Sequence, residues 1–292
     1  MTALLETAGW SSAWPAPAKL NLMLRILDRR PDGYHNLQTV FQFIQQADTL
    51  AFRVRTDGAI RRINSLVDVV EADDLTVRAA ALLQASIGCT LGADIRLDKR
   101  LPMGAGLGGG SSDAATVLVA LNHLWQTGLS RAELATLGVQ LGADVPVFVQ
   151  GKAAWAEGIG ERLQPMDLLE PYYLVLIPDC QVETAKIFAN QQLTRGASAI
   201  TMCDFITGSH ENHCLPTVID LFPPVAAAFT WLQQFAEARL TGTGACVYAE
   251  FSEVAAAQQV LAQIPTTCRG FVTQGMNQSP LYERVAQEPT PA

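Results

Sequence analysis

The chain has 292 residues, of which 49% are hydrophobic and 16% charged, and its formal net charge at pH 7 is −8. This length and composition predict a globular protein of two domains with a sizeable core. The acidic balance argues against a nucleic-acid partner, because nucleic acid requires a basic face. No apolar run approaches the length of a membrane span, so no membrane partner is expected.

The N-terminal segment and the cysteines bear on the cellular compartment. Residues 1–13 lack the basic segment followed by an apolar one that marks a signal peptide. The six cysteines are scattered and form no CxxC pair, which argues against a zinc site and against a disulfide framework. We therefore expect a cytoplasmic protein with reduced thiols.

The first patterned stretch predicts a strand over residues 14–27. Pro15 and Pro17 exclude a helix, and apolar residues then alternate with polar ones. Lys19 stands where this alternation starts. An exposed lysine at the end of a strand and a functional lysine are both open interpretations of this position.

Turn residues at 31–33 end this strand, and Tyr34 and His35 follow directly. An aromatic ring beside a histidine can stack on a planar ligand and hydrogen-bond it, or it can serve in packing. Further alternation predicts two more strands, over residues 39–44 and 48–55.

A helix is predicted to follow Asp73 or Asp74, either of which can cap it, and to end at Gly88. Residues 95–97 then alternate as a half-buried strand. This strand leads directly toward the most distinctive stretch of the chain.

That stretch is Pro102–Ala115, where five glycines fall within seven residues and a helical pattern over 114–125 follows. Glycine lets backbone N–H groups turn toward a ligand, and the start of a helix adds unpaired N–H groups and the positive end of its dipole. Ser111 and Ser112 can add hydroxyl donors. Strand, glycine loop and helix together predict a phosphate site rather than a flexible surface turn.

Two familiar phosphate-binding patterns fit this loop poorly. A P-loop requires lysine and then serine or threonine after its last glycine, where this chain has Gly110 and Ser111. A dinucleotide fingerprint requires a second strand that ends in an acid about 20 residues further on, and the chain continues through a helix instead. Lys99 and Arg100, just before the loop, either help to neutralise a bound phosphate or are solvated charges.

A capping box at Ser130–Glu133 predicts a helix over residues 131–141. Asp144 follows, two residues before Pro146. It can simply cap the short turn that Pro146 begins, or it can be a buried catalytic carboxylate, and the local pattern leaves both open. A hairpin is predicted over residues 150–163.

The pattern breaks over residues 164–171, where we place a domain boundary. Beyond it strands and helices alternate, which predicts a small two-layer domain, and residues 197–216 have no assigned structure. The predicted elements are strands over 172–177 and 270–273, a glycine turn and strand over 240–251, and helices over 183–192, 225–238 and 253–264.

Three groups of residues now carry a resemblance to a known family. They are PAPAKLNL (15–22) with DGYH (32–35), PMGAGLGGGSSDAA (102–115) with GADVPVF (142–148), and LTGTGACVYAEF (240–251). In wording and order they resemble the GHMP kinase superfamily over residues 14–281. The first pair is similar to the branch that phosphorylates a cytidine diphosphate-linked methylerythritol on the non-mevalonate route to isoprenoids.

The resemblance implies an α+β fold of two domains with the active site between them. Residues 1–165 would form an ATP-binding domain similar to domain 2 of ribosomal protein S5. Residues 166–292 would form a ferredoxin-like substrate domain. The protein would be a monomer or a homodimer.

The resemblance also implies roles for individual residues. Lys19 and Asp144 match the catalytic pair, Tyr34 and His35 match residues that hold a cytosine ring, and Phe188 would be the second aromatic of that sandwich. Positions that would line the substrate or the transferred group are Asn21, Thr184, Thr241 and Gly242. The residues expected to wrap the ATP phosphates, with Lys99 in support, are Pro102, Met103, Gly104, Ala105, Gly106, Leu107, Gly108, Gly109, Gly110, Ser111 and Ser112. Glu183 departs from the family pattern, because a small residue is more usual before Thr184.

The chemistry expected of such a site is phosphoryl transfer from ATP to an alcohol, which requires alignment and charge stabilisation. Asp144 would take the proton of the tertiary hydroxyl at C2, and Lys19 would stabilise charge on the transferring group. Mg²⁺ would bridge the ATP phosphates. We assign no protein ligand to the metal, and Ser112 is a conceivable one.

Three rival functions follow from the same residues. The first is another kinase of the superfamily, acting on mevalonate, homoserine or a sugar, and the Tyr34–His35 pair argues against it. The second is a nucleotide-binding module without catalysis, which the presence of both Lys19 and Asp144 disfavours. The third and most distant is a dehydrogenase.

Overall fold

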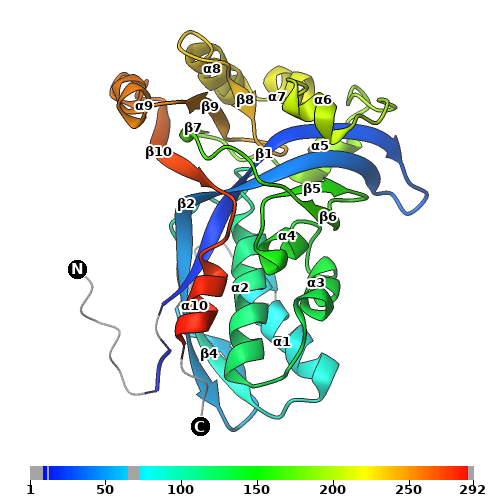
Figure 1. The fold of residues 1–292 in the computed structure, drawn as a ribbon, viewed down its shortest axis with the longest axis vertical. Helices are drawn as coiled ribbons and strands as arrows, with labels where there is room; N and C mark the ends of the chain where they lie inside the picture. The colour runs from blue at the N-terminus through cyan, green and yellow to red at the C-terminus, as the bar shows by residue number, and fades with distance from the viewer. Residues whose placement is uncertain (1–8, 12, 65–72, 289–292) are drawn as a thin grey trace.

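The structure is a computed structural model that describes residues 9–11, 13–64 and 73–288. Its longest elements are two antiparallel strands, β1 (Trp14–Arg29) and β2 (His35–Arg55). This hairpin runs out of the lower half of the molecule and along the underside of the upper half (Figure 1). Both halves are therefore built on one pair of strands.

The sequence predicts two separate strands over 39–44 and 48–55, whereas β2 is continuous. The register between β1 and β2 shifts between Pro17, which pairs with Ala47, and Ala18, which pairs with Ile44. A bulge at this point accommodates the polar residues that interrupt the alternation, so the strand bends without ending.

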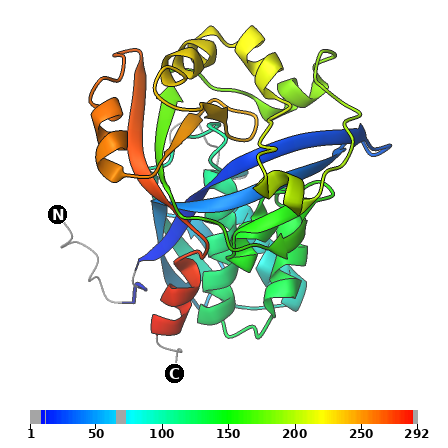
Figure 2. The same cartoon turned by 45° about the horizontal axis from the view of Figure 1, so that its top comes forward.

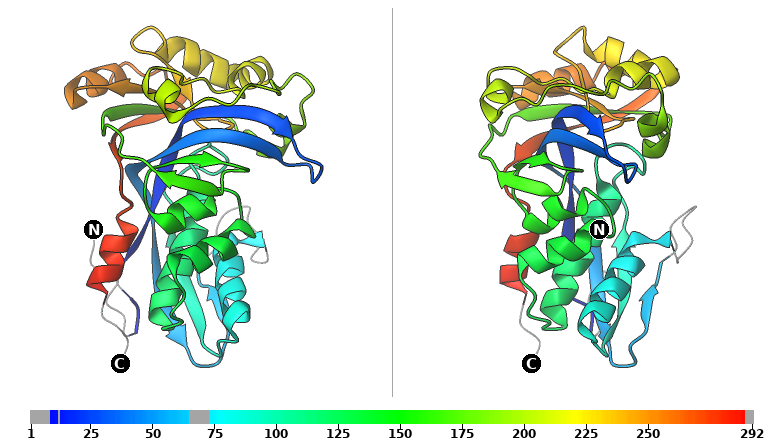
Figure 3. Two further views of the ribbon diagram at one scale, coloured as in Figure 1. Left: turned by 45° about the vertical axis from the view of Figure 1, so that its right-hand side comes forward. Right: turned by 90° about the vertical axis from the view of Figure 1, so that its right-hand side faces the viewer.

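The lower half packs helices against the sheet that contains β1 and β2. Helix α2 contacts both strands, and α1, α3 and α4 lie against α2 (Figure 3). The elements of this half are the strands β3 (Ile60–Arg62), β4 (Gly92–Asp98), β5 (Ala154–Glu157) and β6 (Arg162–Pro165), and the helices α1 (Leu75–Ile87), α2 (Gly109–Leu124), α3 (Arg131–Val139) and α4 (Val145–Gln150).

The upper half is a second layer of strands under helices, seen from above in Figure 2. Its strands continue the same sheet, in the order β3-β4-β2-β10-β7-β9-β8. The strands are β7 (Tyr172–Pro178), β8 (Arg239–Leu240), β9 (Val247–Phe251) and β10 (Cys268–Met276), and the helices are α5 (Thr184–Ala189), α6 (Met202–Ile206), α7 (Leu215–Leu221), α8 (Pro223–Leu232) and α9 (Val254–Leu261).

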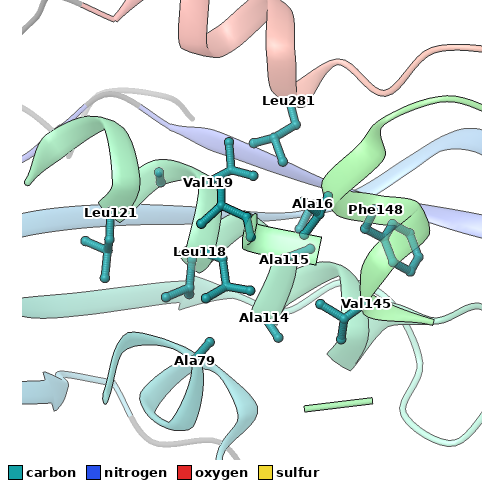
Figure 4. Close-up of a cluster of buried hydrophobic side chains, with 14 of the residues drawn as sticks. Ala16, Ala79, Ala114, Ala115, Leu118, Val119, Leu121, Val145, Phe148 and Leu281 are labelled. Atoms are coloured by element: carbon teal, nitrogen blue, oxygen red, sulfur yellow. The ribbon is translucent and has the colours of Figure 1, made fainter. Parts of the chain in front are cut away.

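The cores of the two halves depart from the predicted division into residues 1–165 and 166–292. Helix α10 (Leu281–Gln287) follows the upper half in sequence, yet Leu281 is buried in the lower core against α2 (Figure 4). Conversely, Leu24 and Ile26 from the tip of the hairpin belong to the upper core. Each half thus lends the other a segment, because burying an apolar face depends on position in space and not on chain order.

Helix boundaries follow the predicted capping chemistry where the sequence carries it. The Asp74 carboxylate accepts the backbone N–H of Thr76 at the start of α1, and Gly88 ends that helix with a left-handed φ of 63°. The predicted capping box of α3 is present at Ser130 and Glu133. Several helices end earlier than expected, namely α3, α5, α8 and α9, and α6, α7 and α10 have no predicted counterpart.

Among the described residues, no single helix is long and apolar enough to cross a membrane. Helices α7 and α8 pass that test of length and composition only as a pair, and the chain bends by 119° between them. All six cysteines lie among the described residues and are free thiols.

Candidate active site

The glycine loop connects β4 to α2, and three of its glycines have backbone angles in the left-handed region. Gly104, Gly106 and Gly108 have φ values of 63°, 78° and 72°. Glycine adopts such angles without steric cost, and alternating them turns successive N–H groups to one side. Helix α2 then starts at Gly109, and its first closed bond runs from the Ser112 N–H to the Gly108 carbonyl. The N–H groups before that bond have no partner within the helix, which is the arrangement that the predicted anion site requires.

The loop rests on the third motif, which joins β8 to β9. The backbone carbonyl of Gly106 accepts the Thr241 hydroxyl at 3.2 Å, and the carbonyl of Ala105 accepts the Cys246 N–H at 3.1 Å. Thr241 also accepts the backbone N–H of Asn21 at 3.0 Å. Three segments far apart in sequence are thereby fixed to one another at the centre of the molecule.

Lys19 and Asp144 meet at the open side of this loop. Lys19 Nζ lies 3.2 Å from Asp144 Oδ2, and it also donates to Asn21 Oδ1 at 2.5 Å and to the Gly106 carbonyl at 3.1 Å. Lys19 is buried, whereas the side chain of Asp144 is 33% exposed. The lysine is therefore fixed on three sides beside a carboxylate that a ligand can reach.

The side chain of Asp144 does not cap a helix, which was the simpler interpretation of this residue. Asp144 occupies the N-cap position of α4, but its side chain accepts no capping hydrogen bond and its φ and ψ are helical, −84° and −14°. Pro146 at the second helical position supplies the restricted φ that starts the helix. The carboxylate is thus free of a capping role and turns to Lys19.

A cavity of about 1030 Å³ runs past this pair, between the two halves of the molecule. It extends from the start of α1 and the glycine loop to the tip of the hairpin and α5. The predicted site residues that line it are Lys19, Asn21, Tyr34, His35, Lys99, Pro102, Met103, Gly104, Ala105, Gly106, Gly108, Gly109, Gly110, Ser111, Asp144, Thr184, Phe188 and Gly242.

Three predicted site residues face elsewhere. The Ser112 hydroxyl donates to the Pro17 carbonyl at 2.7 Å, so Ser112 is neither a free phosphate donor nor a free metal ligand. The side chain of Leu107 is buried in the core, and its carbonyl accepts the Lys19 N–H. Thr241 is fully buried and joins the loop to Asn21 instead of lining the substrate. Each stands inside a motif whose neighbours face the cavity, which misled the sequence-based prediction.

Lys99 lines the cavity at the glycine loop, and its half-buried side chain pairs with two buried acids. Its Nζ is 2.6 Å from Asp48 Oδ2 and 2.6 Å from Asp113 Oδ2. Burial disfavours its charge, but Asp113 and Asp48 together raise the pKa of Lys99. Burial raises the pKa of Asp113 to about 7, against the attraction of Lys99 and with the repulsion of Asp48. Lys99 therefore does not face a phosphate as an unpaired charge, as the sequence suggested.

At the far end of the cavity lie the predicted base-binding rings. The rings of His35 and Phe188 stack with centroids 5.2 Å apart and planes 30° apart. Tyr34, beside them, is 58% exposed. Burial lowers the pKa of His35, and the positive charges of Arg195 and Arg29 lower it further. His35 is consequently a neutral ring at this end of the site.

The wall between the two ends carries hydroxyls. Thr184 Oγ1 lies 2.9 Å from Thr243 Oγ1, and both residues line the cavity. Glu183, the departure from the family pattern, pairs with Lys186 on the surface at 2.5 Å. Both of these side chains are exposed, so Glu183 leaves the Thr184 hydroxyl accessible from the cavity.

Sequence reasoning missed Asp48, Asp113, Thr243 and Arg195. Asp113 and Thr243 stand inside the motifs at residues 102–115 and 240–251, and this position is the signal that points to them. Asp48 begins a predicted strand and Arg195 follows a predicted helix, and neither position carries a local signal of function. Their partners are distant in sequence, so only the fold reveals them.

Comparison with known proteins agrees with this geometry. The GHMP kinases N terminal domain family matches residues 74–152, and the GHMP kinases C terminal family matches residues 200–270. Solved homoserine kinase from Cytophaga hutchinsonii shares the fold, with a TM-score of 0.64 at 13% identity over 96% of this chain and 98% of that one. The chain belongs to the GHMP kinases.

More similar relatives define the branch. The chain is 56% identical to 4-diphosphocytidyl-2-C-methyl-D-erythritol kinase of Alkalilimnicola ehrlichii, over 96% of each chain. It is 53% identical to the enzyme of the same name from Nitrosococcus oceani, over 92% of this chain and 96% of that one. A crystal structure of 4-(cytidine 5'-diphospho)-2C-methyl-D-erythritol kinase superposes with a TM-score of 0.77 at 29% identity, covering 90% of this chain and 98% of that one. Within the GHMP kinases, the chain is a member of this kinase family.

Proposed function

We propose that the protein transfers the γ-phosphoryl group of ATP to the C2 hydroxyl of 4-diphosphocytidyl-2-C-methyl-D-erythritol. This is a step of the non-mevalonate route to isoprenoid precursors. The observation that carries the proposal is the Lys19–Asp144 pair, which lies beside the glycine loop in a cavity of about 1030 Å³ lined by both halves of the molecule. The membership of the chain in this kinase family supports the same reaction.

The nucleotide occupies the end of the cavity formed by the glycine loop and α1. The N–H groups at the start of α2 and the positive end of its dipole attract the phosphates. This local attraction is needed because the net charge of the chain is −8. The γ-phosphoryl group then points along the cavity toward Lys19.

Asp144 and Lys19 act on the acceptor alcohol. The oxygen of the C2 hydroxyl forms a bond to the γ-phosphorus while the bond from that phosphorus to the leaving ADP oxygen breaks. As this happens, Asp144 Oδ2 accepts the proton of the hydroxyl. Lys19 Nζ stabilises negative charge on the transferring group. Its bonds to Asn21 and to the Gly106 carbonyl keep it in place before the substrate binds, so little reorganisation is required.

Mg²⁺ fits this site as an ion that accompanies ATP. The described residues contain no group of three His, Cys, Asp or Glu side chains arranged to hold a metal. Mg²⁺ commonly binds through phosphate oxygens, water and one or two protein oxygens, and it would neutralise charge on the phosphates. With the Ser112 hydroxyl bonded to Pro17, we assign the ion to the hydroxyl of Ser111, which lines the cavity in the first turn of α2.

The cytidine end of the substrate lies at Tyr34, His35 and Phe188. Aromatic rings bind a base by stacking, and Tyr34 is exposed enough to close over one. The hydroxyls of Thr184 and Thr243, with Asn21, line the cavity between the base and the C2 hydroxyl. Mevalonate, homoserine and simple sugars have no base to occupy this end.

Three further proposals concern the protein as a whole. We propose a cytoplasmic location, in keeping with the six free thiols. We propose a functional division into an ATP-binding half and a substrate half near residue 165, with α10 assigned to the first half by its packing. We propose that the unit that performs the reaction is one chain, as a monomer or within a homodimer, since both ends of the cavity come from the same chain.

A direct assay tests the function. Purified protein is incubated with γ-labelled ATP, Mg²⁺ and, in parallel, the cytidine substrate, mevalonate, homoserine or galactose. The proposal predicts label transfer to the cytidine substrate alone. Transfer to one of the other alcohols, or ATP consumption that no acceptor stimulates, would contradict it.

A further inference from the structure

Arg195 lies behind the two stacked rings at the base end of the cavity. Its Nε donates to His35 Nε2 at 3.1 Å, and its Nη2 donates to the carbonyls of Phe188 and Asn190, both at 2.8 Å. Arg195 is half-buried and lies outside the lining of the cavity. One guanidinium therefore joins residues from β2 and from the end of α5 without touching the substrate space.

The bond to His35 determines where that ring carries its proton. A guanidinium is always protonated and only donates, so His35 Nε2 must be an unprotonated acceptor. The ring is then neutral, with its N–H at Nδ1. The charges around the ring are Arg195, Arg29 and Asp28, and with burial they favour the neutral form overall.

The two carbonyl bonds determine where Phe188 lies. The last carbonyls of a helix have no partner within the helix, and an arginine can satisfy them. Arg195 does this at the end of α5, directly at Phe188. The Phe188 ring is thereby held against His35 in the stack.

We propose that Arg195 is a positioning residue for base recognition. It holds His35 neutral, with Nδ1–H as the only ring donor, and it holds Phe188 at the distance that stacking requires. The base recognised is then one that offers acceptor atoms at its edge, as cytosine does. This inference rests on the proposed function for the identity of the base, but not for the arrangement of the three residues.

Kinetics of Arg195→Met provide the first test. The variant removes the guanidinium and keeps an apolar stem, so the KM for the cytidine substrate should rise about tenfold, the effect of losing one well-placed hydrogen bond. The kcat and the KM for ATP should stay within about twofold, because the phosphate end of the cavity is unchanged. An unchanged KM for the cytidine substrate would overturn the proposal, as would equal rises in both KM values.

Arg25→Met is the matched control. Arg25 also holds the segment that follows α5, through Nη2 to the Ser198 carbonyl at 3.3 Å and Nη1 to Glu211 at 2.5 Å, but it contacts neither ring. Its variant should leave the KM for the cytidine substrate near that of the wild type. If Arg25→Met matches Arg195→Met, anchoring of the segment explains the effect and the proposal fails.

Nitrogen NMR of the histidine rings provides a readout independent of the substrate. In the wild-type protein without ligands, the His35 signals, identified by their loss in His35→Gln, should show Nδ1 protonated and Nε2 unprotonated near neutral pH. In Arg195→Met this fixed tautomer should be lost. A wild-type ring that carries its proton at Nε2 overturns the inference. A wild-type enzyme that ignores the cytidine substrate overturns the proposed function, while the NMR result still decides the arrangement.

Discussion

Gly106 lies directly against Thr241 where the two halves of the molecule meet. The Gly106 carbonyl accepts the Thr241 hydroxyl at 3.2 Å, and a Cβ at position 106 would lie 2.3 Å from the Thr241 carbonyl oxygen. The φ of Gly106 is also left-handed, at 78°. Only glycine satisfies both conditions, so the glycine loop is seated directly on the motif that joins β8 to β9.

Replacing Gly106 by alanine should therefore displace the loop. Steady-state kinetics of Gly106→Ala should show kcat/KM for ATP reduced by about 10- to 100-fold, since a misplacement of about 1 Å can cost 10²-fold. Gly128→Ala is the control, because Gly128 has a similar φ of 74° and nothing within 4 Å of its Cβ position. Gly128→Ala should retain activity near that of the wild type. Equal losses in the two variants would mean that backbone strain alone, and not the contact with Thr241, determines the effect.

Removing either aromatic ring at the base end should weaken substrate binding selectively. Tyr34→Ala and Phe188→Ala should each raise the KM for the cytidine substrate by an amount equivalent to roughly 1–3 kcal/mol, as for stacked bases. The KM for ATP should change little, because neither ring lies at the glycine loop. Phe235→Ala, at an exposed aromatic of the upper half, controls for general effects of truncation. A rise in the KM for ATP as large as that for the cytidine substrate would contradict the assignment.

The buried acid Asp113 should make stability depend on pH. Its pKa is about 7 in the folded state against an ordinary value of 3.8, so the folded state holds the proton more tightly. Unfolding releases that proton between these two pH values, and the contribution of Asp113 to stability is lost as pH rises toward 7 and beyond. Asp113→Asn lacks this contribution, so its free energy of unfolding relative to the wild type should increase from pH 4.5 to pH 8.

Urea unfolding of both proteins at the two pH values measures this difference. Asp98→Asn provides the control, because Asp98 is an exposed partner of Arg100 near the same strand end. For Asp98→Asn the difference from the wild type should be nearly constant with pH. A constant difference for Asp113→Asn as well would mean that Asp113 titrates normally in the folded protein.

Much of the fold could be predicted because its signals are local. The glycine loop between β4 and α2, the caps at Asp74 and Ser130, and the alternation of β1 each depend on neighbours in sequence. The continuity of β2 could not be predicted, because a bulge preserves the pairing where the alternation stops. Helix α10 returns to the lower core because it packs against α2. Its seven residues do not indicate in the sequence which core they join.

The site was predictable to the same extent. The resemblance of the motifs to a known family predicts Lys19 and Asp144 as a catalytic pair, and the fold places the two side chains in contact. The same resemblance predicts Ser112 and Thr241 as ligand-binding residues, but their hydroxyls donate to backbone carbonyls inside the protein. A motif identifies which residues lie near a ligand, but the direction of each side chain depends on partners from other segments. Asp48 and Arg195 are such partners, and their own surroundings in the sequence are unremarkable.

In the proposed mechanism, Asp144 accepts the proton of the alcohol while Lys19 stabilises the phosphoryl group. The most direct measurement is the rate of phosphoryl transfer to the cytidine substrate by Asp144→Asn, with Asp98→Asn as the control and circular dichroism to verify the fold. Loss of a general base should lower kcat by about 10²–10⁴-fold at nearly unchanged KM. A folded Asp144→Asn protein that keeps most of the wild-type kcat would contradict the mechanism.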